Sequence, residues 1–315
     1  MCSQMSLQCA IDAYFSEKIN LSAATVKTYR HASDHFCKYV QNKPLNHITR
    51  ADIRNWRNDL LGSPAYLDHP NRTHDDDELL TNSSVRRMMT SVRAIFNWLI
   101  REEEIEKSPF KNVSIPRRED LHPTAISDDD IARMREEAHI YSGNKSADVG
   151  KLVIARNRAI LEVLISTGAR VGEIADLRRA DVCTQTREMI VRGKGGKLRK
   201  LYLTPKAASV VQYWLEIAPQ CAYLLTAIES NYGEQFTKNS IRSMLLRLGN
   251  RASCTGSHSP HHFRHWRAIK WLLNGMPLAQ VSRLLGHSSI EITYKHYGRF
   301  YDHQLKAEHA KYTLE

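Results

Sequence analysis

Four short segments in the later part of the chain carry the arginine, lysine, histidine and tyrosine side chains that chemistry on a phosphate requires. In one of them, residues 260–265, His261 and Arg264 are three residues apart, so on a helix they share a face. An arginine offers a fork of donors to phosphate oxygens, and a neutral imidazole can move a proton. The pair therefore predicts a site that binds a phosphate and transfers a proton.

Arg170 and Lys194 each lie beside glycines, where the backbone can turn sharply. Arg170 follows an apolar stretch and is flanked by Gly168 and Gly172, which predicts a bend instead of a solvated helix face. An ordinary salt bridge is the simpler interpretation of this arginine taken alone. Lys194 lies on a glycine-rich turn, from which a lysine can reach a neighbouring groove. Spacing alone favours a solvated turn lysine.

His287 and Tyr297 lie ten residues apart near the end of the chain. Gly286 can end one helix, so His287 is expected at the corner before the next helix, with Tyr297 further along it. A phenolic oxygen can act as a nucleophile. Tyr294 and Tyr301 are alternative nucleophiles, although Tyr294 is better interpreted as a packing residue.

The histidine-rich segment also allows a zinc site as an alternative. His258, His261, His262, His265 and Cys254 are close in sequence, but their spacing fits no standard zinc pattern. A zinc-dependent hydrolase would contain stoichiometric metal and would lose activity with a chelator. We therefore expect no metal at this segment.

Helices and one hairpin are expected to position these groups. Residues 189–192 and 198–203 are predicted as two short strands, because the glycines between them supply the positive φ angles of a tight turn. Ser127 with Asp130 predicts the start of a helix. The pattern becomes helical again after the second strand.

The N-terminal third of the chain is predicted to be helical. Its most regular apolar stripe runs from Val85 to Ile100, and Arg86, Arg87 and Arg93 lie largely off this stripe. These arginines are candidates for DNA phosphate contacts, and a solvated basic face is an equally good explanation. Prolines between residues 107 and 124 indicate a linker.

The charge of the chain is uneven. Residues 1–113 carry 15 basic and 14 acidic side chains, whereas residues 114–315 carry 30 and 20, within a net charge of +11. A polyanionic partner explains this surplus, although a basic protein without such a partner is the simpler alternative. The sequence shows no apolar run long enough for a membrane span and no secretory signal, and its cysteines lack CxxC spacing. We expect a cytoplasmic protein with reduced thiols and no membrane association.

Taken together, the groups occur in the order Arg, Lys, His-x-x-Arg, His, Tyr, and this order resembles the catalytic set of the tyrosine recombinase (phage integrase) family. The segments "ARVGE", "HHFRH" and "LLGHSSIEIT" carry the resemblance, which covers nearly the whole chain. It implies a mainly α fold with a small β-sheet. Residues 1–113 would form a helical, SAM-like core-binding domain, 114–124 a linker and 125–315 an α+β catalytic domain.

The resemblance also implies a role for each matching residue. Two positions depart from the family pattern, since His262 replaces a usually acidic residue and Trp266 a usually small or hydroxyl one. Neither departure removes a catalytic group. The implied roles are a phosphate clamp for Arg170 and Arg264, a general acid for Lys194, assistance to the nucleophile for His261, a phosphate contact for His287 and the nucleophile for Tyr297.

The implied activity is site-specific DNA recombination through a covalent 3′-phosphotyrosyl intermediate, without any cofactor. The implied partners are double-stranded DNA carrying a specific recombination site and three further copies of the chain, in a homotetramer on DNA. An accessory DNA-bending protein is a further candidate partner. The alternatives are a type IB topoisomerase, which shares the chemistry, and a catalytically silent DNA-binding protein. The short N-terminal part favours a simple two-domain enzyme of Xer, integron or transposon type.

Overall fold

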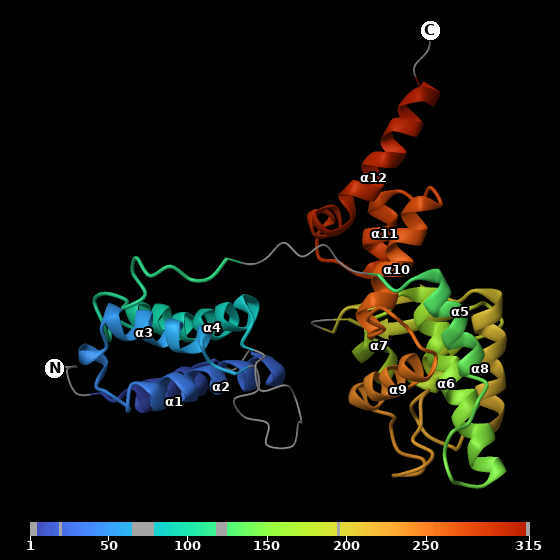
Figure 1. Cartoon of the computed structure of the whole chain (residues 1–315), viewed down its shortest axis with the longest axis horizontal. Helices are drawn as coiled ribbons and strands as arrows, with labels where there is room; N and C mark the ends of the chain where they lie inside the picture. The colour runs from blue at the N-terminus through green and yellow to red at the C-terminus, as the bar shows by residue number, and fades with distance from the viewer. Residues whose placement is uncertain (1–4, 19–20, 65–78, 118–124, 194–195, 313–315) are drawn as a thin grey trace. The chain divides into compact units, whose positions relative to one another are not determined.

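A computed structural model describes residues 5–18, 21–64, 79–117, 125–193 and 196–312. The chain divides into two compact units, Met1–Leu121 and His122–Glu315 (Figure 1). Each unit has a hydrophobic core of its own. The predicted architecture, mainly helical with a small sheet, is confirmed.

The first unit consists of helices. Thr49 and Asp52 form the capping box that begins the third helix, and Gly62 ends it. The core contains Phe36 and Trp56, whose rings lie 4.7 Å apart between centroids. The elements are α1 (Leu7–Glu17), α2 (Ala23–Tyr39), a 3₁₀ turn η1 (Leu45–His47), α3 (Arg50–Leu61) and α4 (Asn82–Arg101).

The second unit combines helices with a three-stranded sheet. As predicted, the side chain of Ser127 accepts a hydrogen bond from the Asp130 N–H at the start of its first helix. The helices are α5 (Asp128–Glu137), α6 (Ala147–Thr167), α7 (Val171–Ala175), η2 (Arg179–Asp181), α8 (Pro205–Ile217), α9 (Lys238–Arg251), α10 (Pro260–Leu273), α11 (Leu278–Leu285) and α12 (Ile290–Tyr312). The strands are β1 (Val182–Cys183), β2 (Glu188–Arg192) and β3 (Leu198–Tyr202).

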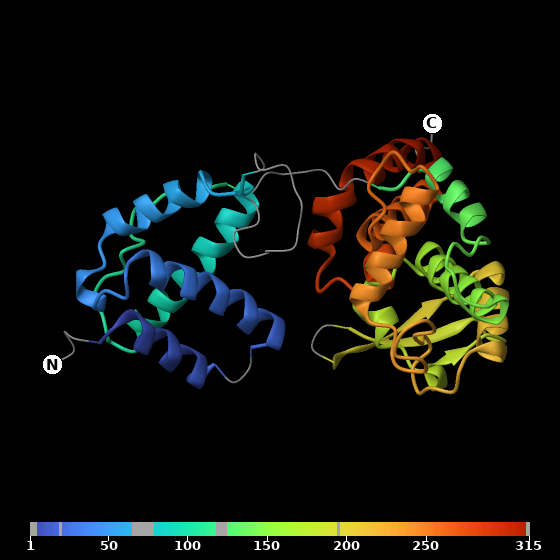
Figure 2. The same cartoon turned by 60° about the horizontal axis from the view of Figure 1, so that its bottom comes forward.

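The sheet is antiparallel in the order β1-β2-β3, and it pairs Met189 with Leu201. Met189, Val191 and Leu201 are buried, so one face of the hairpin belongs to the core. Figure 2 shows the sheet, in yellow-green, next to the green helix α6, which packs on β3. The predicted hairpin is confirmed, while β1 was not predicted because two residues show no alternation.

Helices α10, α11 and α12 pack on one another and enclose a second, smaller apolar cluster (Figure 1). Leu272, Val281 and Leu285 are buried there, and so is Tyr297. The phenol ring is therefore part of the apolar contact between these helices. Among the described residues, none of the helices combines the length and the apolar character needed to span a membrane.

Candidate active site

Arg170 lies at the bend between α6 and α7. Gly168 ends α6 in the left-handed conformation, with φ of +58°. A Cβ on Gly168 would lie 3.2 Å from Cβ of Arg267 on α10, so close packing also favours glycine here. Arg170 directly precedes α7, and its backbone N–H donates to Oε2 of Glu173 at 2.8 Å. The bend thus fixes the backbone position from which the side chain of Arg170 extends.

Arg264 is buried on α10 and joins two other helices. Its Nη1 donates to the carbonyl oxygen of Gly168 at 3.1 Å, and its Nη2 donates to that of Leu285 at 2.7 Å. Burial lowers the pKa of Arg264 to about 10, which still leaves it charged at neutral pH. The predicted helical pairing of His261 with Arg264 is confirmed, because both lie on α10.

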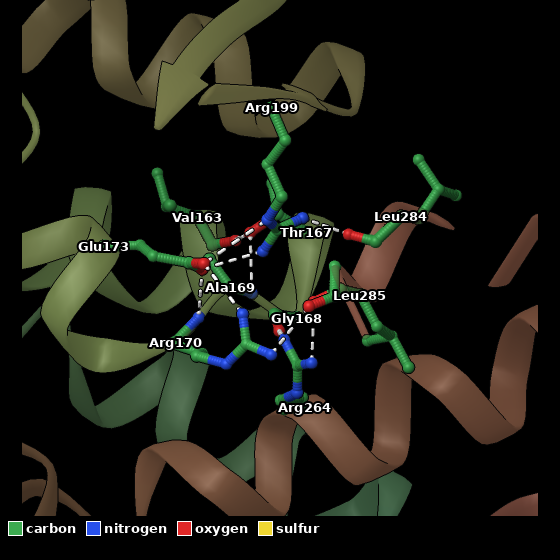
Figure 3. A network of polar contacts seen from close by, with 11 residues as sticks. Val163, Thr167, Gly168, Ala169, Arg170, Glu173, Arg199, Arg264, Leu284 and Leu285 are labelled. Carbon is green, nitrogen blue, oxygen red and sulfur yellow. Dashed lines mark hydrogen bonds and ion pairs between the residues drawn. The ribbon is translucent and has the colours of Figure 1, made fainter. Parts of the chain in front are cut away.

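Three arginines from three different segments meet at the C-terminal end of α11 (Figure 3). The last carbonyl groups of a helix lack partners within it and carry partial negative charge. Gly286, with φ of +65°, ends α11, and a Cβ there would lie 2.8 Å from the side chain of Arg199. The carbonyl oxygens are bound by Arg199 at Leu284, by Arg264 at Leu285 and by Arg170 at Gly286.

Glu173 is the carboxylate of this cluster. It is buried, and its oxygens accept hydrogen bonds from Arg170 at 3.0 Å and from Arg199 at 2.7 Å (Figure 3). Burial alone would raise the pKa of Glu173, but the hydrogen bond and charge of Arg199, together with Arg170, outweigh it and leave the pKa lowered. Because Arg264 bonds to carbonyl groups and not to Glu173, the cluster contains three guanidinium groups but only one carboxylate, which Arg170 and Arg199 share. The cluster therefore retains positive charge that an anion can neutralise.

The two predicted active-site histidines are close to these charges. Burial, followed by the charge of Arg264, lowers the pKa of His261. His287 lies between α11 and α12, as predicted, and its Nδ1 is 2.7 Å from Oγ1 of the buried Thr293. Burial and the charges of Arg264 and Arg170 lower the pKa of His287 to about 4. The imidazole of His287 is therefore neutral at pH 7.

Tyr297 lies on α12 with only 1% of its surface exposed. Its hydroxyl is 2.5 Å from Nδ1 of His265, the residue after Arg264 on α10. Burial raises the pKa of Tyr297 to about 12, although the charge of Arg264 acts in the opposite direction. Tyr294 is 54% exposed, and the side chain of Tyr301 lies outside the described residues.

Lys194 also lies outside the described residues. Its neighbour Gly193 is described, and its N–H donates to the carbonyl oxygen of Lys197 at 2.8 Å across the turn. A Cβ on Gly193 would be 3.7 Å from Oε1 of Glu173. The base of the predicted lysine-bearing turn therefore borders the arginine cluster.

Sequence reasoning assigned no role in phosphate chemistry to several residues that the structure brings into this site. Three of them stand inside the motif segments, since Glu173 ends "ARVGE", His265 ends "HHFRH" and Thr293 ends "LLGHSSIEIT". Arg199 has no comparable local signal, because its partners Glu173 and Leu284 are remote in sequence. These four residues hold Arg170, Tyr297 and His287 in place.

The zinc alternative gains no support from the part of the chain that the structure describes, where no three His, Cys, Asp or Glu side chains are grouped to hold a metal ion. His258 instead has its two ring nitrogens near the carbonyl oxygens of Gly256 and Leu246. His262 lies 2.8 Å from the hydroxyl of Ser259.

The three candidate arginines of the first unit are exposed, and they line two different open hollows. Arg86 and Arg87 line a hollow of about 520 Å³ between α2 and α4, and Arg86 also donates to the carbonyl oxygen of Pro116 at 3.0 Å. Arg93 lines a different hollow, beside residues 106–113. The first hollow is lined by Ala24, Thr25, Thr28, Tyr29, Ser83, Arg86, Arg87, Thr90 and Ser91.

Comparison with known proteins identifies the family. The phage integrase family model matches residues 139–304, and the model of the phage integrase N-terminal SAM-like domain matches residues 11–103. The chain belongs to the phage integrase family. The resemblance predicted from the motif order is thus confirmed, and the protein is a tyrosine site-specific DNA recombinase.

The recombinase has relatives that match nearly its full length. Tyrosine recombinase XerC of Vibrio cholerae is 27% identical over 299 residues, which cover 92% of this chain and 89% of that protein. XerH bound to palindromic difH substrate has a similar fold, with a TM-score of 0.69, 18% identity and coverage of 95% of this chain and 83% of that one. A lambda integrase tetramer bound to a Holliday junction has a TM-score of 0.68 at 15% identity, with coverage of 91% and 75%.

Proposed function

We propose that the recombinase cuts and rejoins double-stranded DNA at a specific site, with Tyr297 as its nucleophile and with Arg170 and Arg264 as the clamp on the scissile phosphate. The observation that carries this proposal is the arginine cluster at the end of α11, where three guanidinium groups meet beside a single carboxylate that bonds to two of them. Tyr297 lies close enough to Arg264 for the guanidinium charge to oppose the rise in its pKa that burial causes.

The arginines act on the charge of the transition state. When the phenolic oxygen attacks, phosphorus becomes five-coordinate and its equatorial oxygens gain negative charge. Arg170 and Arg264 are already fixed by carbonyl groups, so they need little reorganisation to meet that charge. A preorganised donor of this kind typically contributes about 10²–10³ in rate.

Lys194 is proposed as the general acid. The bond between phosphorus and the 5′ oxygen breaks as the bond to Tyr297 forms, and the departing oxygen needs a proton. A lysine at the tip of the β2–β3 turn can supply it, and the base of this turn lies beside Glu173. Proton transfer of this kind usually contributes about 10²–10⁴ in rate.

His261 and His287 complete the proposed phosphate site. Both imidazoles have a lowered pKa, so at neutral pH they can hydrogen-bond to a phosphate without adding charge. Thr293 engages Nδ1 of His287, which leaves Nε2 for a non-bridging oxygen. We propose that His261, which is exposed on α10, assists deprotonation of Tyr297 by accepting the phenolic proton as the bond to phosphorus forms.

The reaction conserves its phosphoester bonds. The product of cleavage is a 3′-phosphotyrosyl link and a free 5′ hydroxyl, and attack by the 5′ hydroxyl of a second duplex reverses the step. Because one ester replaces another, the exchange requires neither ATP nor a redox partner. Attack by the original 5′ hydroxyl restores the strand, whereas attack by the 5′ hydroxyl of the second duplex recombines the strands.

We propose that the first unit is the core-binding domain and that the hollow of Arg86 and Arg87 faces DNA phosphates, with Arg93 as a candidate on a separate surface. A homotetramer on paired sites is the proposed assembly, as in the lambda integrase complex with a Holliday junction. An accessory DNA-bending protein is a further proposed partner. The cytoplasm is the proposed compartment, because the substrate is DNA.

The decisive experiment uses nicked suicide duplexes prepared from the replicon that encodes the protein. A covalent adduct formed by the wild type and absent with Tyr297→Phe would support the proposal and identify the site. Adduct formation by Tyr297→Phe would transfer the nucleophile role to another tyrosine. Absence of an adduct with the wild type, although the duplex is bound, would contradict the proposed catalytic function.

A further inference from the structure

His265 is the side chain that lies on the hydroxyl of the proposed nucleophile. Its Nδ1 is 2.5 Å from the oxygen of Tyr297, and both residues are buried. His261, Arg264 and His265 are spaced i, i+3 and i+4 along α10, so they face the same side of the helix. The hydrogen bond therefore joins α12 to the face of α10 that carries the proposed phosphate ligands.

The direction of this hydrogen bond depends on the protonation states of the two groups and on the tautomer of His265. Burial, followed by the neighbouring His261 and His296, lowers the pKa of His265 to about 3. Burial raises the pKa of Tyr297 to about 12. Both groups are thus neutral at pH 7, and the hydroxyl donates to Nδ1 in the tautomer of His265 that carries its proton on Nε2.

A fixed O–H direction matters for a nucleophile that attacks in line. The phenolic O–H can rotate about its C–O bond, and an acceptor on one side turns the oxygen lone pairs toward the other. The ring of His265 is itself held, because it meets the ring of His261 edge to face with centroids 4.2 Å apart. The ring centroid of Tyr297 lies 5.6 Å from that of His265.

We propose that His265 is a positioning residue of the recombinase, whose neutral imidazole accepts a hydrogen bond from Tyr297 and aims the phenolic oxygen for attack on phosphorus. The inference rests on the proposed role of Tyr297 as nucleophile. It assigns His265 an acceptor function, in which the position of the ring nitrogen matters and its capacity to take up a proton does not.

Two substitutions separate these properties. His265→Asn retains a side-chain acceptor close to the place of Nδ1 but cannot act as a base, whereas His265→Phe retains a ring without an acceptor. His262→Asn is the matched control on the same helix, because His262 contacts Ser259 and Ser257 instead of the nucleophile. The measurement is the single-turnover rate of adduct formation on the nicked suicide duplex at saturating DNA, with DNA affinity and thermal unfolding measured in parallel.

We expect His265→Phe to reduce the cleavage rate about 10²-fold, the scale that follows from a misplaced reacting group. His265→Asn should cleave within about tenfold of the wild type, and the DNA affinity of both variants should be unchanged, because the lost bond orients a reacting atom. If His265→Phe does not fold, His265→Leu replaces it as the variant without an acceptor. Restored cleavage in the asparagine variant distinguishes positioning from a role in folding alone.

Two results would overturn the inference. Wild-type cleavage by His265→Phe would show that the hydrogen bond is dispensable. Cleavage by His265→Asn as slow as by His265→Phe, in a folded and DNA-bound variant, would show that the imidazole takes up the proton. Wild type and Tyr297→Phe accompany every assay, so the absence of a wild-type adduct would contradict the proposed function instead of this inference.

Discussion

The two units use arginine in different ways. In the second unit, Arg264 is buried and its guanidinium is bound to carbonyl oxygens of two helices, while Arg170 and Arg199 share the carboxylate of Glu173. In the first unit, Arg87 is exposed and lines an open hollow. The same side chain is therefore rigid and partly desolvated in one unit and solvated in the other.

This difference follows from what each region is proposed to do. A charge that stabilises a transition state is most effective when it is already in place and shielded from water. A charge that attracts the DNA backbone can remain solvated, because its free energy comes from released counterions. Arginines of the second unit should therefore affect the rate of cleavage, and those of the first unit should affect affinity.

The largest expected effect is on the catalytic side. Arg264→Ala removes a fixed donor from the proposed phosphate clamp, so single-turnover cleavage of the suicide duplex should slow by about 10²–10³. DNA affinity should change little. Arg251→Lys is the control, since Arg251 pairs with Glu137 between α9 and α5. A loss of affinity equal to the loss of rate would contradict the assignment of Arg264 to the transition state.

The carboxylate of the cluster should affect stability. Glu173→Gln leaves Arg170 and Arg199 without their shared negative charge, and breaking a buried ion pair costs about 3 kcal/mol or more. The measurement is the free energy of unfolding in urea. Glu188→Gln is the control, because its partner Lys200 is exposed and such pairs contribute about 0–1 kcal/mol. Equal effects of the two variants would show that the cluster tolerates uncompensated charge.

A smaller effect is expected from pH, and it should be confined to the second unit. The pKa values of His265 and His287 are about 3 and about 4 in the folded chain, compared with about 6.5 in an unfolded one. Between those values the unfolded chain binds protons that the folded chain does not, so stability should fall as pH falls below about 6.5. Above that pH the contribution of these histidines is complete.

Hydrogen exchange can assign this pH dependence to one unit. Between pH 6.5 and 5, where carboxylates remain ionised, amides of α10 and α12 should lose protection relative to those of α4, after correction for intrinsic exchange. His287→Asn should reduce this loss. Protection that declines equally in both units would contradict a cause located at the active-site histidines.

Much of the site could be predicted because its local geometry is determined by the residues of short segments. Glycines mark the bend before Arg170 and the end of α11 before His287, and the i, i+3 spacing of His261 and Arg264 requires only that they lie on a helix. Those features depend on backbone preferences within a few residues. The hairpin of β2 and β3 was predicted for the same reason.

The supporting contacts could not be predicted, because they join distant segments. Arg199 reaches Glu173, which is 26 residues away, and the carbonyl oxygen of Leu284, which is 85 residues away. His265 meets Tyr297 only because α10 packs on α12. Pairings of this kind depend on tertiary packing, for which a single sequence contains no local signal.

The smallest expected effect tests the first unit. Arg87→Gln removes one proposed phosphate contact from an exposed hollow, so it should weaken binding similarly on specific and nonspecific duplexes and reduce the slope of log affinity against log salt by about 1. Arg101→Gln, at the last residue of α4, is the control. Cleavage at saturating DNA should be unchanged, because Arg87 does not belong to the arginine cluster at α11. A slower cleavage rate at saturating DNA, with an unchanged slope of log affinity against log salt, would contradict the assignment of binding to the first unit and of chemistry to the second.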